Sequence, residues 1–147
     1  MPALGHRFGV PQLLVVLAAG AVAVHLFGLY RPTGPPSPSW FPHIDKAEHL
    51  IGFGAPVCLV LLARWRWRRR SGQDLTRRFT GLVVGAFALH ALVSEVAQHF
   101  FYVHRTGDVL DVLADWTGVA LGWAVAWGIR RSAQGRAGRA AATAQAT

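Results

Sequence analysis

The stretch PQLLVVLAAGAVAVHLFGLY, Pro11–Tyr30, contains no Asp, Glu, Lys or Arg. A helix of a soluble protein keeps a polar face along its length, and no such face recurs here at a helical period. About 20 apolar residues are what a helix needs to cross the hydrocarbon core of a bilayer. The stretch therefore predicts a membrane-spanning helix, which we place at residues 10–30.

A cleaved signal peptide is a second interpretation of the same stretch. Signal peptides begin with a positively charged region and end at a cleavage site of small residues. Here the charged start consists only of His6 and Arg7, and no clear small-x-small site follows the apolar core. We therefore expect an uncleaved first span.

Three more apolar segments follow, at residues 44–63, 79–103 and 109–129, each close to spanning length. Across the whole chain 52% of residues are hydrophobic and 15% are charged, which a soluble all-α bundle rarely combines. The predicted fold is an all-α integral membrane bundle of four transmembrane helices over residues 10–130. The tail, residues 131–147, is rich in Ala, Gly, Ser and Thr and is predicted to be disordered.

The distribution of basic residues predicts the topology. With both termini and the loop after the second span on one side, that side holds all of the 15 Lys and Arg residues except Arg31, Lys46 and Arg105. Lys and Arg are in excess on the cytoplasmic side of membrane proteins. The prediction is N-in and C-in in the inner (plasma) membrane, with residues 1–9 and 131–147 cytoplasmic. The net charge of +8 then indicates contact with lipid headgroups rather than nucleic acid.

The acidic residues gather on the opposite, outer side. On a helix, Asp111 and Asp115 share one face, with Asp108 at its edge, and the same face continues through Gly118 and Gly122. The G-x-x-x-G spacing lets a neighbouring backbone approach closely. We therefore expect this acidic face to point into the protein.

The second and third segments repeat this pattern of a polar outer end above small residues, with Gly52 in the second and Gly81 in the third. Packing the three stripes together gives a polar pocket open to the outside. The candidate pocket residues are Asp45, Lys46, His49, Glu95, Gln98, His99, Arg105, Asp108, Asp111 and Asp115. The glycines expected at helix contacts are Gly52, Gly81, Gly118 and Gly122. His25 and His90, both mid-span, are expected to form hydrogen bonds between helices.

Two interpretations of the acids remain open. An ionised acid at the centre of a spanning helix costs about 2.5 to 3.5 kcal/mol, so such groups are normally paired or functional. They either tie the helices together or form a binding or catalytic site, and the absence of a G-x-S-x-G motif favours binding over catalysis. A proton or ion path through Glu95 is a further alternative.

Metal binding is a further interpretation of the same residues. His49, His99, Glu95 and Asp111 are suitable ligand types, but no segment places two of them in the H-E-x-x-H arrangement. We therefore expect no metal and no other cofactor.

The ordered motifs resemble one known family. D-K-x-x-H at Asp45–His49, E-x-x-Q at Glu95–Gln98, Arg105, and D-x-x-x-D-x-x-G at Asp111–Gly118 resemble the VanZ-like family of small bacterial membrane proteins, over roughly Ser39–Ile129. Many members have Asn where this chain has Asp115, and Tyr where it has Phe53.

The resemblance implies a cell-envelope protein connected with resistance to the glycopeptide teicoplanin. We therefore expect a pocket that binds, or chemically alters, an extracytoplasmic ligand such as a cell-wall precursor, a lipid or a glycopeptide. The resemblance does not decide whether the protein is an enzyme.

Overall fold

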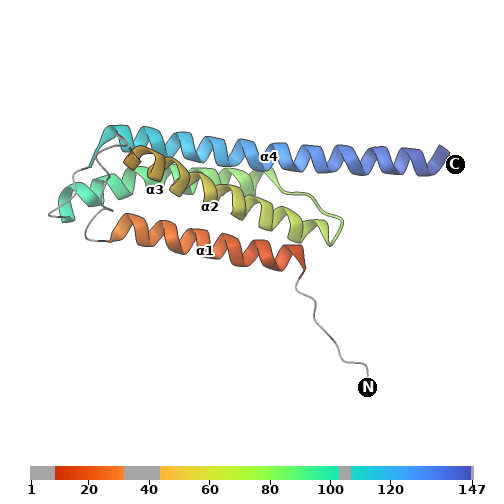
Figure 1. Cartoon of the computed structure of the whole chain (residues 1–147), viewed down its shortest axis with the longest axis horizontal. Helices are drawn as coiled ribbons and strands as arrows, with labels where there is room; N and C mark the ends of the chain where they lie inside the picture. Colours follow the sequence, from red (N-terminus) through yellow and green to blue (C-terminus); the bar gives the residue numbers. More distant parts are fainter. Residues whose placement is uncertain (1–8, 32–43, 103–106, 147) are drawn as a thin grey trace, which may run out of the picture.

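A computed structural model describes residues 9–31, 44–102 and 107–146. Within these ranges the chain forms four helices and no strand, and the helices are α1 (Val10–Tyr30), α2 (Ile44–Arg69), α3 (Arg77–Phe101) and α4 (Val109–Ala146). Figure 1 shows them side by side, with α4 continuing beyond the others. Of the N-terminal segment predicted to be cytoplasmic, residues 1–9, all but Gly9 lie outside the described part of the chain.

Local sequence explains where the helices begin. Pro11 lies in the first turn of α1, where a missing N–H costs nothing. The Thr76 hydroxyl accepts a hydrogen bond from the Phe79 N–H at 3.2 Å and caps α3. The carboxylate of Asp108 accepts one from the Leu110 N–H at 2.8 Å at the start of α4. Gly72, with φ of +69°, makes the turn after α2.

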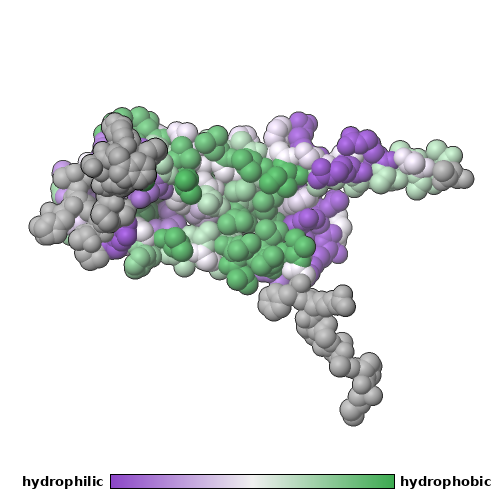
Figure 2. Space-filling model, viewed as in Figure 1, coloured by the Kyte–Doolittle hydropathy of each residue, from purple (hydrophilic) through white to green (hydrophobic). Residues whose placement is uncertain are grey.

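The outer surface of the bundle is apolar. All four helices of the described chain are long and apolar enough to cross a membrane, and large side chains point outward, including Val24 (72% exposed), Phe27 (70%) and Phe101 (81%). Figure 2 shows this apolar surface as a wide band over the middle of the molecule, with hydrophilic residues beyond it. Such a surface requires lipid as its solvent. The predicted integral membrane bundle of four helices is confirmed.

Helix α2 packs against α1 on one side and α4 on the other. The contact with α4 brings backbone against backbone: a Cβ atom added to Gly118 would collide with the Leu50 carbonyl, and one added to Gly122 with the Gly54 carbonyl. Gly118 and Gly122 therefore lie where the backbones of α4 and α2 approach closely, and Gly54 is their partner on α2.

The prediction for the other two glycines was wrong. A Cβ atom added to Gly52 or Gly81 would meet nothing within 4 Å. Gly52 is two residues before Gly54, about 200° around the helix, and so faces away from α4. Gly81 is exposed on a face of α3 that meets no neighbouring helix in the described chain.

The C-terminal tail also differs from expectation. Instead of disordered chain after residue 130, α4 continues to Ala146. Ala and Arg make up most of this segment and rank among the strongest helix formers, whereas the prediction of disorder rested on its richness in Ala, Gly, Ser and Thr. Helix α2 likewise runs on to Arg69, past the predicted end at residue 63.

The bundle has two chemically different ends. The polar end is where α1 and α3 finish and α2 and α4 begin, and the basic end is where α2 finishes and α3 begins, near Arg68, Arg69 and Arg130. Which end faces the cytoplasm stays a prediction.

Candidate functional site

Lys46 is the centre of the charged residues at the polar end. Its ammonium nitrogen Nζ lies 2.6 Å from Oδ1 of Asp111, 2.7 Å from Oδ2 of Asp108 and 3.0 Å from Oδ2 of Asp45. The hydrogen bond from Lys46 holds the pKa of Asp108, which lies outside the spanning helices, below its ordinary value. One cation from α2 thus joins the first turn of α2 to the first turn of α4.

His49, one turn further along α2, faces Asp115 and Asp111. Its Nδ1 forms a hydrogen bond of 2.9 Å with Oδ1 of Asp115, whose side chain is fully buried. Its Nε2 lies 3.8 Å from Oδ2 of Asp111, which is too long for a hydrogen bond. The ring is therefore fixed by Asp115 and directed towards Asp111.

Glu95 reaches the same place from α3. Its side chain is 5% exposed, and its Oε2 accepts a hydrogen bond of 2.9 Å from the Asp108 N–H. A Cβ atom on Gly107 would lie only 2.6 Å from the Glu95 carbonyl oxygen, so glycine there permits this close contact. Within the described residues Oε1 of Glu95 has no hydrogen-bond partner, and neither does Oδ2 of Asp115.

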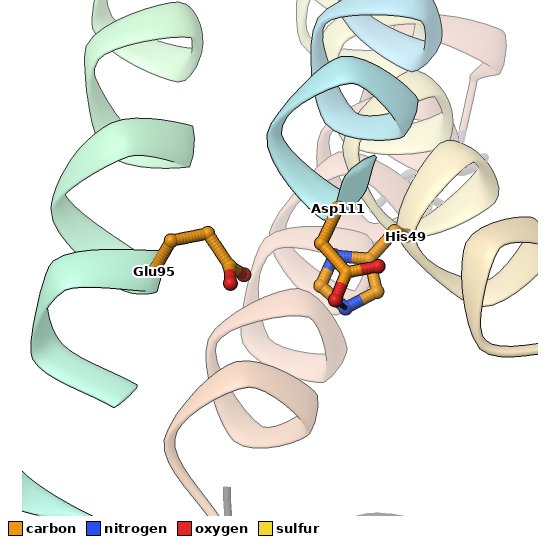
Figure 3. A group of neighbouring side chains, drawn as sticks. All are labelled: His49, Glu95 and Asp111. Atoms are coloured by element: carbon orange, nitrogen blue, oxygen red, sulfur yellow. Dashed lines mark ion pairs between the residues drawn. The ribbon is translucent and has the colours of Figure 1, made fainter. Parts of the chain in front are cut away.

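Three of these side chains converge. Figure 3 shows Glu95 from α3, Asp111 from α4 and His49 from α2 pointing towards one another. One ligand-type atom of each lies within 4.8 Å of those of the other two. The polar cluster, as we call it from here on, consists of Asp45, Lys46, His49, Glu95, Asp108, Asp111 and Asp115.

The other predicted pocket residues are placed differently. Gln98 turns towards α1, where its amide donates a hydrogen bond of 3.3 Å to the Leu29 carbonyl. His99 is exposed and its ring packs edge-on against Phe100. Arg105 lies outside the described residues. Seven of the ten candidates therefore form the polar cluster.

A cavity that the sequence analysis missed lies beside the polar cluster. It has a volume of about 370 Å³, lies between α1 and α2, and is mostly apolar. Small residues create it, among them Gly20, Gly52 and Ala55. The polar residues in its lining are His25, Arg31, Glu48 and His49. The sequence signal for this cavity is the presence of small residues in both helices. One of them, Gly52, was instead predicted to lie at a close contact between helices.

A chain of hydrogen bonds crosses from α1 to α3 beside this cavity. His25 Nε2 lies 3.1 Å from His90 Nδ1, and His90 Nε2 lies 2.9 Å from the Tyr30 hydroxyl. The prediction that His25 and His90 form hydrogen bonds between helices is confirmed.

The fold and the polar cluster define a small multi-pass membrane protein with its buried charges gathered at one end. The chain belongs to the VanZ/LLP1 family, whose sequence profile matches residues 12–130. The resemblance noted for Ser39–Ile129 is thereby confirmed, and the match takes in most of the first helix as well. No curated protein and no solved structure has significant similarity to the chain.

Proposed function

We propose that this protein binds a membrane amphiphile, such as a lipid or a lipid-linked cell-wall precursor, on the outer side of the plasma membrane. The apolar part would lie in the cavity between α1 and α2, and the polar head would lie at the polar cluster. The observation that carries the proposal is the position of His49, which lines the apolar cavity and also belongs to the polar cluster.

The lining of the cavity suits such a ligand. Ligand sites are mostly apolar with a few polar groups that fix orientation. Here most lining residues, from Gly20 to Pro56 in the sequence, are apolar. Arg31 and Glu48 also line the cavity and offer one positive and one negative group to a polar head. A volume of about 370 Å³ accommodates part of an acyl or isoprenoid chain better than a whole glycopeptide.

The outer placement rests on charge. The basic residues of the α2–α3 connection and of α4 favour the cytoplasm for the basic end, which puts the polar cluster outside. Family membership and this placement together connect the protein with the cell envelope, and glycopeptide susceptibility is the phenotype to examine.

The decisive experiment is a substitution that fills the cavity at a position without a close helix contact. Gly52→Leu adds a side chain where nothing lies within 4 Å, and Gly81→Leu does the same on an exposed face away from the cavity. Lipid retained by each purified protein after detergent exchange would be measured by native mass spectrometry. We expect Gly52→Leu to retain at least tenfold less of the lipid that the wild type selects, and Gly81→Leu to match the wild type.

Equal retention by Gly52→Leu and the wild type would overturn the proposal. A folded Gly52→Leu variant with unchanged thermal stability is the required control, and the same pair would then be compared for glycopeptide susceptibility in cells.

Proton or ion transport is the alternative, and the His25–His90–Tyr30 chain is the observation that favours it. Past this chain towards the basic end, however, residues 10–24, 79–89 and 116–129 contain no Asp, Glu, Lys, Arg or His. A proton relay needs such groups along the path. Gradient-driven flux in proteoliposomes, abolished by His90→Leu, would favour transport over amphiphile binding.

A further inference from the structure

The side chains of three residues, His49, Glu95 and Asp111, point towards one another without a hydrogen bond between any two of them. The 3.8 Å between His49 Nε2 and Asp111 Oδ2 is too long for a hydrogen bond, yet it is close to the separation of two ligands on one metal ion. Ligand atoms about 2.1 Å from a tetrahedral metal lie about 3.5 Å apart. The ligand atoms of the set lie within 4.8 Å of one another, so a movement of about 1.3 Å at one side-chain end brings the widest pair to the separation found on a metal ion.

Each of the three side chains is held by its other polar atom. Asp111 Oδ1 accepts from Lys46, which leaves Oδ2 on the side of His49. Glu95 Oε2 accepts from the Asp108 N–H, and the buried Oε1 has no partner in the described part of the chain. A buried carboxylate oxygen without a partner is costly, and a cation at this point would remove that cost.

His49 carries the most specific sign. Its Nδ1 lies 2.9 Å from the fully buried carboxylate of Asp115. In the tautomer whose Nδ1–H donates to this carboxylate, Nε2 is an acceptor on the side of Asp111. A histidine bound to a metal through one nitrogen nearly always donates its other N–H to a carboxylate or carbonyl in this manner. The Asp115 contact of His49 and the unpartnered, buried Oε1 of Glu95 are therefore two separate observations that point to the same ligand.

We propose that His49, Glu95 and Asp111 bind a divalent transition-metal ion of the zinc class, with Asp115 as the positioning residue for His49. Imidazole favours zinc and its neighbours over calcium and magnesium. Three protein ligands leave a coordination position open, as in zinc sites that bind a further oxygen ligand. An H-E-x-x-H motif requires two ligands on one helix, whereas these three come from α2, α3 and α4, which is why the sequence alone predicts no metal. The proposal does not depend on the amphiphile site.

Metal content of the full-length protein tests this directly. Protein purified in detergent without chelator would be analysed by elemental mass spectrometry, then stripped and titrated with zinc, manganese, magnesium and calcium salts while thermal unfolding is followed. We expect one zinc-class ion per chain and an unfolding temperature that rises with zinc but not with magnesium or calcium at the same concentration. Substoichiometric metal together with no zinc-dependent stabilisation would overturn the proposal.

Variants separate a defined site from general attraction to negative charge. Asp115→Asn should weaken zinc binding by about ten- to a hundredfold through loss of histidine positioning, and Glu95→Gln should weaken it further. Asp45→Asn is the matched control, because Asp45 touches Lys46 and is not one of the three ligands. If Asp45→Asn weakens zinc binding as much as Asp115→Asn, the site is wrong.

The wild-type titration decides the question even if a variant fails to fold. Gly52→Leu keeps the two proposals apart, since it should lose the amphiphile and bind zinc normally.

Discussion

The two ends of the bundle each hold a charged carboxylate in contact with a cation, but they differ in burial and in how the carboxylate oxygens are satisfied. At the basic end Asp74, whose side chain is 48% exposed, has both oxygens occupied: Oδ1 accepts from the Leu75 N–H and from Arg130, and Oδ2 accepts from Gln134. At the polar end, Glu95 and Asp115 are nearly or fully buried, and each keeps one oxygen without a partner among the described residues.

This difference separates a structural ion pair from a candidate site. A contact that only ties helices together has no reason to leave a buried acceptor unsatisfied, because that costs about 1 to 3 kcal/mol. The polar end accepts this cost at two carboxylates. At the basic end both oxygens of Asp74 are occupied, and the buried atom without a partner among the described residues is a donor, Nε of Arg130. The comparison therefore favours a structural role for the Asp74 contacts and supports the proposed ligand binding at the polar cluster.

The largest expected effect comes from separating α2 and α4 beside the polar cluster. Gly118→Val places side-chain atoms against the Leu50 carbonyl, next to His49. Overpacking costs about 1 to 3 kcal/mol in ordinary cores, and against rigid backbone we expect at least about 3 kcal/mol. The variant should accumulate poorly and unfold at a lower temperature in detergent.

Gly128→Val is the control on the same helix, since nothing lies within 4 Å of an added Cβ atom there. It carries the same change in helix propensity. Equal loss of stability in the two variants would mean that the close α2–α4 contact does not hold the polar end together.

An intermediate effect is expected at Lys46. Lys46→Met leaves Asp108 and Asp111 without their cation, and removing one partner of a buried ion pair costs about 3 to 5 kcal/mol. Because the Lys46 side chain is 22% exposed, we expect about 2 kcal/mol. The measurement is the midpoint of denaturant unfolding in detergent micelles.

Arg130→Met at the basic end sharpens the comparison. Its partner Asp74 is open to solvent and keeps its bonds from Leu75 and Gln134, so the loss should stay under about 1 kcal/mol. A larger loss for Arg130→Met than for Lys46→Met would reverse the assignment of the two ends.

The smallest effect is the pH dependence of the basic end. Burial alone would raise the pKa of Asp74, but the Leu75 N–H, Gln134 and Arg130 outweigh it and hold the pKa below its ordinary value. A carboxyl with a lowered pKa adds stability above its unfolded-state value of about 3.9, and that stability is lost as pH falls through the folded value.

Wild type and Asp74→Asn should therefore differ in thermal stability at pH 6 and converge towards pH 3. A difference that grows as the pH falls would contradict the assignment.

The spans and most of the polar cluster follow from sequence because they depend on local information. Apolar length determines the helices, and helical phase places Asp111, Asp115 and Gly118 on one face. Helical phase could not decide whether Gln98 and His99 belong to the polar cluster, because their side chains point to either side of Glu95 around α3. Which of the three meets a neighbour depends on the positions of α1 and α4, and that is tertiary information.

The same reason explains the errors over glycine and the tail. Gly52 and Gly54 lie on opposite sides of α2, and only the packing of three helices decides which side meets α4. For residues 131–146, the content of Gly, Ser and Thr and the helix propensity of Ala and Arg give opposite predictions, and the structure follows propensity.

The length of α4 offers a way to determine orientation. Its 38 residues extend about 57 Å, whereas the hydrocarbon core is about 30 Å thick. Roughly 25 Å of helix, including Arg136 and Arg139, therefore stands clear of the bilayer beyond the basic end. A protease site placed near Gly138 would be cut only from the compartment that this helix enters. Digestion of intact cells and of inverted vesicles would identify that compartment, and the polar cluster faces the opposite one.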